Sequence, residues 1–130
     1  MKIALLNDTH FGCRNDSPAF INYQNRFYDE LFFPYIIENK IDTLIHLGDV
    51  VDRRKFINFN TAHNFQQKFW KRLWDLKIDT HIILGNHDTY YKNTNKVNSI
   101  QQLCTSFDGI NEPWIYDGPK EVELGGCRML

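Results

Sequence analysis

The stretch "THIILGNHD", residues 80–88, joins a short apolar run to a turn of polar residues. Its first five residues, through Leu84, have the length and composition of a buried strand. The next four, from Gly85 to Asp88, place an amide, an imidazole and a carboxylate on one turn. Open parallel sheets bind ligands beyond the carboxyl ends of their strands. The stretch therefore predicts a strand of such a sheet with a functional site at its end.

Two earlier segments show the same arrangement of a strand followed by polar residues. A short apolar run over residues 2–7 precedes Asp8-Thr9-His10, and the run over 43–47 precedes Gly48-Asp49. In a parallel sheet these clusters would lie at the same edge, although they are far apart in the sequence. We expect the glycines at 48 and 85 to permit sharp turns and a close approach of main chains.

Two helical segments separate the three strands. The first begins at Ser17-Pro18, an N-cap followed by a proline in the first turn, and Pro34 is expected to interrupt it. Its apolar residues recur every three or four positions: Phe20, Tyr23, Phe27 and Leu31. The second should be capped by Asn60, and its apolar face consists of Phe65, Phe69, Leu73 and Leu76. This alternation predicts an α/β fold with a mostly parallel sheet and flanking helices.

The last third of the chain has weaker patterns. We expect a helix over 97–104, a strand over 113–116, and a hairpin over 122–130 that turns at Gly125-Gly126. The second arm of this hairpin stops at Leu130, with no partner for the next main-chain groups. We therefore expect residues 1–130 to be the N-terminal portion of a single domain.

Composition and charge narrow the class of protein. The 130 residues are 42% hydrophobic and 24% charged with a net charge of -1, which is ordinary for a globular protein, so any contact with nucleic acid must be local. Three cysteines without CxxC spacing indicate reduced thiols and a cytoplasmic location. No signal peptide or apolar run of membrane-spanning length is present in the sequence, so we expect no membrane partner.

The polar clusters offer a mixed set of metal ligands. The candidates are Asp8, His10, Asp49 and Asn86, which supply carboxylate, imidazole and amide groups. Nitrogen and oxygen ligands of this kind suit manganese, iron or zinc better than calcium. Asp49 is the candidate to bridge two cations about 3.5–4 Å apart, the spacing of two-metal phosphoryl chemistry. We expect two divalent metal ions, with Mn²⁺ first and Mg²⁺, Fe²⁺ or Zn²⁺ as alternatives.

Further residues near these clusters are candidates for catalysis and substrate binding. We expect His87 to be catalytic, with Asp88 bonded to its imidazole to orient it. His46 and His81 lie inside apolar strands and are expected to be packed or hydrogen-bonded. The run after Gly48-Asp49 could contact a phosphate backbone or be a solvated loop: Asp52, Arg53, Arg54 and Lys55.

The three motifs resemble those of the calcineurin-like metallophosphoesterases. Within that superfamily the chain is most similar to nucleases of double-strand-break repair and recombination, namely the SbcD-like type and the endonuclease subunit of tailed phages. The similarity lies in "DTHFG" (8–12), "GDVVDRRKFIN" (48–58) and "GNHDTYYKN" (85–93). The resemblance implies a four-layer α/β/β/α sandwich, of which this chain is the first half.

The resemblance also implies roles for the site residues. Asp8, His10 and Asp49 would hold the first metal, Asp49 and Asn86 part of the second, and His87 would be the catalytic histidine. The family completes both metal sites with three further histidines, and this sequence has none after His87. We therefore expect the isolated chain to be inactive and to bind at most one manganese ion.

The partners implied by the resemblance are DNA, a coiled-coil ABC-type ATPase subunit (SbcC-like) and a second copy of the chain. A phage-encoded protein would act in the host cytoplasm. Two alternatives remain open at this point. One is a phosphomonoesterase or cyclic-nucleotide phosphodiesterase of the same superfamily, and the other is a non-catalytic DNA-end-binding module with an incomplete metal site.

Overall fold

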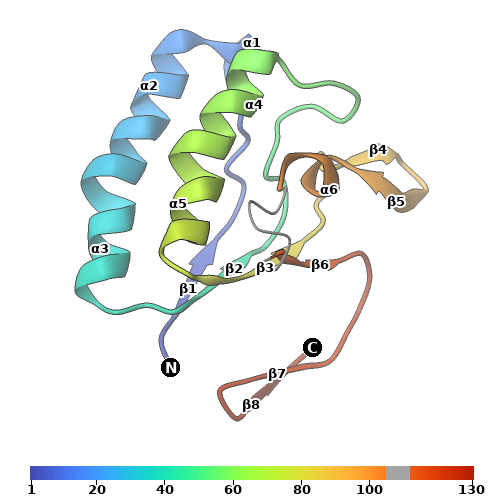
Figure 1. Ribbon diagram of the computed structural model, residues 1–130. Helices are drawn as coiled ribbons and strands as arrows, with labels where there is room; N and C mark the ends of the chain where they lie inside the picture. Colours follow the sequence, from blue (N-terminus) through green and yellow to red (C-terminus); the bar gives the residue numbers. More distant parts are fainter. Residues whose placement is uncertain (105–111) are drawn as a thin grey trace.

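A four-stranded parallel sheet forms the centre of the molecule (Figure 1). The computed structural model describes residues 1–104 and 112–130, apart from the side chains of 94–96. The sheet has the order β1-β2-β3-β6, and every pair of neighbours is parallel. The strands are β1 (Ile3–Leu6), β2 (Thr43–His46), β3 (Asp79–Ile83) and β6 (Trp114–Tyr116). The predicted α/β class with a parallel sheet is confirmed.

Two helical columns lie side by side on one face of the sheet (Figure 1). The first consists of α2 (Pro18–Arg26), the π-helical η1 (Phe27–Phe32) and α3 (Phe33–Glu38). The second consists of α4 (Phe59–Phe65), the π-helical η2 (Gln66–Trp70) and α5 (Lys71–Asp75). Pro34 is the second residue of α3, two positions after η1 ends at Phe32, and it has no N–H to donate to the preceding turn. The first column therefore widens before the proline, where the sequence predicts an interruption.

The core lies between these columns and the sheet. Leu44 and Ile82 point from the central strands toward the helices and are fully buried. Phe65, Phe69 and Leu73 form the buried face of the second column as predicted, whereas Leu76 follows the last turn and is 39% exposed. A cluster of aromatic rings packs around Phe69: Phe11, Tyr28, Phe32, Phe33 and Phe65. Trp70 is also buried, so it belongs to the packed interior.

Two local predictions about helix starts were wrong. Asn58, two residues earlier than expected, caps α4, because its side-chain oxygen accepts the N–H of Asn60 at 2.8 Å. Val97 lies in an antiparallel hairpin formed by β4 (Thr89–Tyr91) and β5 (Thr94–Asn98). The helix that follows, α6 (Ser99–Leu103), is shorter than predicted because Asn98 caps it by accepting the N–H of Gln101.

The chain ends in the predicted hairpin of β7 (Val122–Leu124) and β8 (Cys127–Met129), with Gly125 and Gly126 at positive φ in the turn. The hairpin borders a groove of about 580 Å³ over the sheet face opposite the helices. Apolar side chains from the strands and from the residue after β2 line this groove: Leu5, Ile45, Leu47 and Ile83. In the described part of the chain, no helix has the length and apolar character needed to cross a membrane.

Candidate metal centre and catalytic site

The loops after β1 and β2 run side by side at the carboxyl edge of the sheet. Their main chains are paired: Asp8 donates to the Gly48 carbonyl at 3.2 Å, and His10 donates to the Asp49 carbonyl at 3.1 Å. Asp8, His10 and Asp49 all have left-handed backbone conformations, with φ of 52°, 43° and 52°. Each such residue costs on the order of 1–3 kcal/mol, and such residues cluster at functional sites. The backbone strain therefore coincides with the residues that the sequence marks as metal ligands.

Two glycines allow the loops after β2 and β3 to touch. Gly48 has φ of 107°, and a Cβ on it would lie 2.9 Å from the main chain of Gly85. A Cβ on Gly85 would overlap the main-chain nitrogen and carboxylate of Asp49. The expected close approach at positions 48 and 85 is confirmed, and it places the loop of His87 against Asp49.

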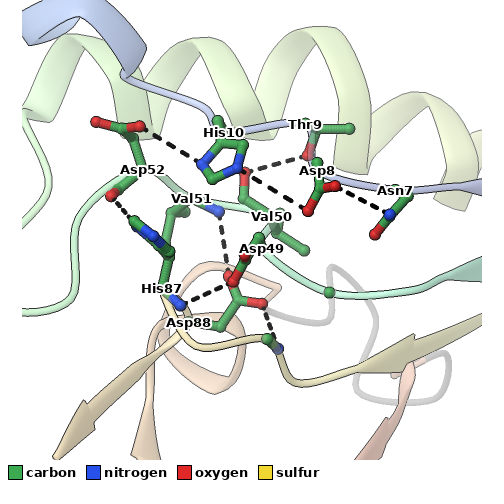
Figure 2. Close-up of polar contacts among 12 residues, drawn as sticks. Asn7, Asp8, Thr9, His10, Asp49, Val50, Val51, Asp52, His87 and Asp88 are labelled. Atoms are coloured by element: carbon green, nitrogen blue, oxygen red, sulfur yellow. Dashed lines mark hydrogen bonds and ion pairs between the residues drawn. The ribbon is translucent and has the colours of Figure 1, made fainter. Parts of the chain in front are cut away.

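Three of the four predicted metal ligands lie together. Ligand atoms of Asp8, His10 and Asp49 are all within 4.8 Å of one another. Figure 2 shows His10 between Asp8 and Asp52, with its Nε2 4.0 Å from the Asp8 carboxylate. Two carboxylates and one imidazole in close contact form a donor set that suits a divalent first-row cation.

Asn86, the fourth predicted ligand, has an exposed side chain. The next residue, His87, connects this loop to the cluster, because its main-chain N–H donates to Asp49 Oδ1 at 2.8 Å. This bond leaves Asp49 Oδ2 for other contacts. The structure therefore places Asn86 beside the cluster through the backbone of the loop.

Asp52 contacts both histidines of the site. Its carboxylate lies 3.5 Å from His10 Nδ1, and its main-chain carbonyl accepts a hydrogen bond from His87 Nδ1 at 2.5 Å. The two imidazoles meet edge to face, with ring centroids 5.0 Å apart. His10, Asp52 and His87 form a second group whose ligand atoms lie within 4.8 Å of one another. The sequence identifies Asp52 as a candidate site residue. Its position between two histidines depends on the tertiary fold and could not be predicted from the motif.

The predicted contact between Asp88 and the His87 imidazole is wrong. Asp88 is fully buried, and its two carboxylate oxygens accept the N–H groups of Val51 at 3.1 Å and Gly85 at 3.0 Å. Burial raises the pKa of this carboxyl, and the two backbone donors partly oppose that shift. Asp88 thus connects the loops after β2 and β3 through its two carboxylate oxygens. The imidazole of His87 is oriented instead by the Asp52 carbonyl (Figure 2).

His46 and His81 are both hydrogen-bonded inside the sheet, as predicted. His46 Nδ1 accepts the N–H of Gly48, so its Nε2 donates to Thr9 Oγ1 at 3.0 Å, and Thr9 donates to the Val50 carbonyl. Burial lowers the pKa of His46 to about 4. His81 lies between the Tyr116 hydroxyl and the Asp79 carboxylate, at 2.7 and 3.1 Å. The neutral form of His46 therefore connects the first two site loops.

The basic residues after Asp52 differ in their surroundings. Arg53 donates to Asp16 Oδ2 at 2.8 Å and to Asn15 Oδ1 at 2.5 Å, and Asp16 also accepts from Thr61. Asn15 and Asp16 belong to α1 (Cys13–Asp16), a short turn with left-handed backbone. In the part of the chain that the structure describes, Arg54 has no ion-pair partner, and Lys55 Nζ lies 5.7 Å from the Tyr90 ring centroid. Arg53 is thus held by an ion pair within the protein, whereas Lys55 contacts only an aromatic ring among the described residues.

Comparison with known proteins agrees with this geometry. The sequence profile of the family described as "Calcineurin-like phosphoesterase" matches residues 1–126. The chain is also similar to "Exonuclease subunit 1" of Enterobacteria phage T4, with 33% identity over 129 residues. That match covers 99% of this chain and 37% of the relative, so the chain spans little more than a third of the relative's length. The chain belongs to the calcineurin-like phosphoesterase family.

Proposed function

We propose that this protein is the N-terminal portion of a metal-dependent DNA nuclease that hydrolyses phosphodiester bonds. The observation that carries this proposal is the cluster of Asp8, His10 and Asp49 at the carboxyl edge of the sheet, with His87 beside it. The family supports phosphoester hydrolysis, and the exonuclease name of the phage relative favours a nucleic-acid substrate. A role in recombination and repair follows from the sequence resemblance.

We propose two divalent cations as cofactors, with Mn²⁺ first and Mg²⁺, Fe²⁺ or Zn²⁺ as alternatives. Asp8, His10 and Asp49 would hold one, and Asp49 with Asn86 would provide part of the other site. Such cations supply charge neutralisation at the phosphoryl group and activation of the attacking water. The donor set fits this role, because two carboxylates lie together and only one imidazole accompanies them.

His87 is proposed as the proton-transfer group. A carbonyl oxygen can only accept, so the bond to Asp52 requires the proton on His87 Nδ1. The other nitrogen, Nε2, then remains to face the substrate. When protonated, it can stabilise charge on the phosphoryl group or donate a proton to the leaving oxygen.

Residues 1–130 are proposed to be the first half of a four-layer α/β/β/α domain. The helices cover one face of the sheet, while the opposite face borders the apolar groove of Leu5, Ile45 and Leu47. Sheets of this class are stable when both faces are buried. A second sheet over this groove would bury it and bring the remaining histidine ligands of the family.

DNA is the proposed substrate, with Arg54 and Lys55 as the nearest candidates for phosphate contacts. Both lie within three residues of Asp52 in the sequence, whereas Arg53 is bound to Asp16. The name of the phage relative describes a subunit, which supports a partner protein. The coiled-coil ABC-type ATPase stays a prediction from the sequence resemblance.

The test compares this chain with a chimera in which the part of the phage T4 relative beyond the matched region is fused to its C-terminus. Manganese binding is measured by calorimetry, and cleavage is measured on double-stranded DNA and on a small phosphodiester. The chain alone should bind at most one manganese ion and cut nothing, whereas the chimera should bind two and cut DNA. Asp49→Asn should abolish binding and cleavage in the chimera, and Asp75→Asn on the surface of α5 is the matched control.

Three outcomes would contradict parts of the proposal. Manganese-dependent cleavage by the chain alone would contradict the half-domain assignment. A chimera that binds two manganese ions and hydrolyses only phosphomonoesters or cyclic nucleotides would contradict the nuclease assignment. Metal-independent DNA binding with no hydrolysis of any ester would favour the non-catalytic alternative.

A further inference from the structure

Thr9 lies between two of the proposed metal ligands, Asp8 and His10, and its side chain contacts the loop of the third. The hydroxyl of Thr9 donates to the Val50 carbonyl at 3.1 Å (Figure 2). Val50 directly follows Asp49 in the loop after β2. A single hydroxyl therefore joins the loop of the first two ligands to the loop of the third.

His46, the last residue of β2, completes this contact from inside the sheet. Its Nδ1 accepts the N–H of Gly48 at 3.2 Å, so the ring proton is on Nε2. Nε2 then donates to the Thr9 hydroxyl at 3.0 Å, and the hydroxyl proton is directed to the Val50 carbonyl. We call the contacts of Thr9 with His46 and Val50 the Thr9 bridge. Each hydrogen bond of the bridge thus has a defined direction.

The main chain of Thr9 is held from the opposite side. Gln24 of α2 donates from Nε2 to the Thr9 carbonyl at 2.6 Å. The residues on either side of Thr9 are Asp8 and His10, which have left-handed backbones with φ of 52° and 43°. Such conformations persist only where surrounding contacts hold them. Because Thr9 is held at its side chain and at its carbonyl, it can maintain both strained neighbours.

The Thr9 bridge is better shielded from water than the main-chain pairing of the same loops. The N–H groups of Asp8 and His10 donate to the β2 loop over 3.2 and 3.1 Å, at the long end of the usual range. Asp8 is also exposed, and exposed main-chain hydrogen bonds open most easily. In contrast, the partners of the bridge, His46 and Val50, are 1% and 0% exposed.

Loss of the groups that hold metal ligands in place typically lowers metal affinity by about 10–100-fold. We propose that Thr9 and His46 are positioning residues that hold the two ligand loops at a fixed distance and thereby raise the affinity for manganese. This role rests on the proposed function, because it requires Asp8, His10 and Asp49 to be the ligands.

Calorimetric manganese titration of Thr9 variants tests the proposal. Thr9→Val keeps the shape of the side chain without its hydroxyl and should bind manganese about tenfold more weakly or worse. Thr9→Ser keeps the hydroxyl and should bind nearly as the parent does. The matched control is Thr80→Val, because Thr80 is buried near the other end of β3 and its hydroxyl donates to the Ile78 carbonyl at 3.0 Å. This control should lose stability and keep its manganese affinity.

Hydrogen exchange in the absence of metal gives a second measurement. The N–H groups of Asp8 and His10 should exchange faster in Thr9→Val than in the parent or in Thr9→Ser. The N–H of Val51, which donates to Asp88, should exchange at the parent's rate in all three. A parent chain that bound no manganese would contradict the proposed metal site, and the exchange rates would still decide whether the bridge holds the loops.

Two substitutions of His46 separate its two hydrogen bonds. His46→Gln carries an amide nitrogen near the position of Nε2 and can still donate to Thr9. His46→Asn carries an amide oxygen near the position of Nδ1 and can accept only the N–H of Gly48. His46→Gln should therefore retain more of the manganese affinity than His46→Asn.

Two results would overturn the proposal. One is a Thr9→Val chain with the manganese affinity and the exchange rates of the parent. The other is an equal loss of affinity in Thr9→Val and Thr80→Val, which would mean that the loss reflects general stability and not the position of the loops.

Discussion

The main-chain carbonyl of Asp52 holds the imidazole of His87 through a hydrogen bond of 2.5 Å. The carboxylate of the same residue lies 3.5 Å from His10 Nδ1. One residue of the β2 loop thus orients the proposed acid with its backbone and contacts a proposed ligand with its side chain. The orientation of His87 depends on the path of this loop more than on the side chain at position 52.

The role proposed for His87 gives the first prediction. In the active chimera, His87→Ala should lower turnover by about a hundred- to ten-thousand-fold, the usual contribution of a general acid. Manganese affinity should stay nearly unchanged, because the carboxylates of Asp8 and Asp49 remain. Calorimetry and DNA cleavage are measured on the same preparation, with exposed His63→Ala as the control. Undiminished cleavage by His87→Ala would remove this residue from the mechanism.

The buried carboxylate of Asp88 gives a second prediction. Asp88→Asn leaves one acceptor oxygen for the two N–H donors of Val51 and Gly85, so one donor loses its partner. An unsatisfied buried donor costs about 1–3 kcal/mol, and urea unfolding should show a loss of this size. Glu38→Gln, at the exposed end of α3, should leave stability unchanged. Normal stability with impaired turnover would instead support a catalytic role for Asp88.

The two adjacent arginines should behave differently. Arg54→Ala should reduce the log–log salt slope of DNA binding by roughly 0.9 for its lost phosphate contact, without changing thermal stability. Arg53→Ala should lower the melting temperature, because Asp16 loses its charged partner, and should leave the salt slope unchanged. Arg53→Lys keeps the charge and should recover part of the stability. Equal salt slopes for both alanine variants and the parent would show that neither residue contacts DNA.

His46 predicts a loss of stability in acid. Its pKa is about 4 in the folded protein and about 6.5 in an unfolded chain, so the unfolded state binds the proton more tightly. Stability is therefore fully present above pH 6.5 and falls as the pH decreases toward 4, by up to about 3 kcal/mol. His46→Gln should flatten this part of the stability–pH curve relative to His63→Gln. An unchanged slope would show that the neutral form of His46 is not required.

The strands and the clustering of ligands were predictable because both follow from local pattern and one general rule. Each apolar run is short and ends in polar residues, and the carboxyl ends of parallel strands lie at one edge. Asp8, His10 and Asp49 meet there although about forty residues separate the first two from the third. This inference needs only that the strands are parallel, which the βαβ alternation predicts.

Other features depend on contacts that local pattern does not contain. The first column has two sets of apolar residues at helical spacing, an exposed one that contains Phe27 and a buried one that contains Tyr28. The spacing alone does not decide which of the two sets faces the core. Arg53 and Arg54 are chemically identical neighbours, and only the contact with Asp16, 37 residues away, distinguishes them. Asp88 and His87 are adjacent, yet their side chains leave the turn toward different partners. These assignments required the tertiary arrangement.

The contact between Gly48 and Gly85 positions the loops after β2 and β3 through their main chains, independently of which side chains bind the metal. Neither residue carries a Cβ, so the main chains of the two loops come into contact there, and the carboxylates of Asp49 and Asp88 add hydrogen bonds to the main chain on either side. Exchanges of the Asp8 and His10 side chains would therefore alter metal preference while leaving the loops after β2 and β3 in place, whereas Asp49 also holds the loop of His87. The fold thus offers a fixed scaffold on which ligand sets can be swapped to make sites for softer or harder cations.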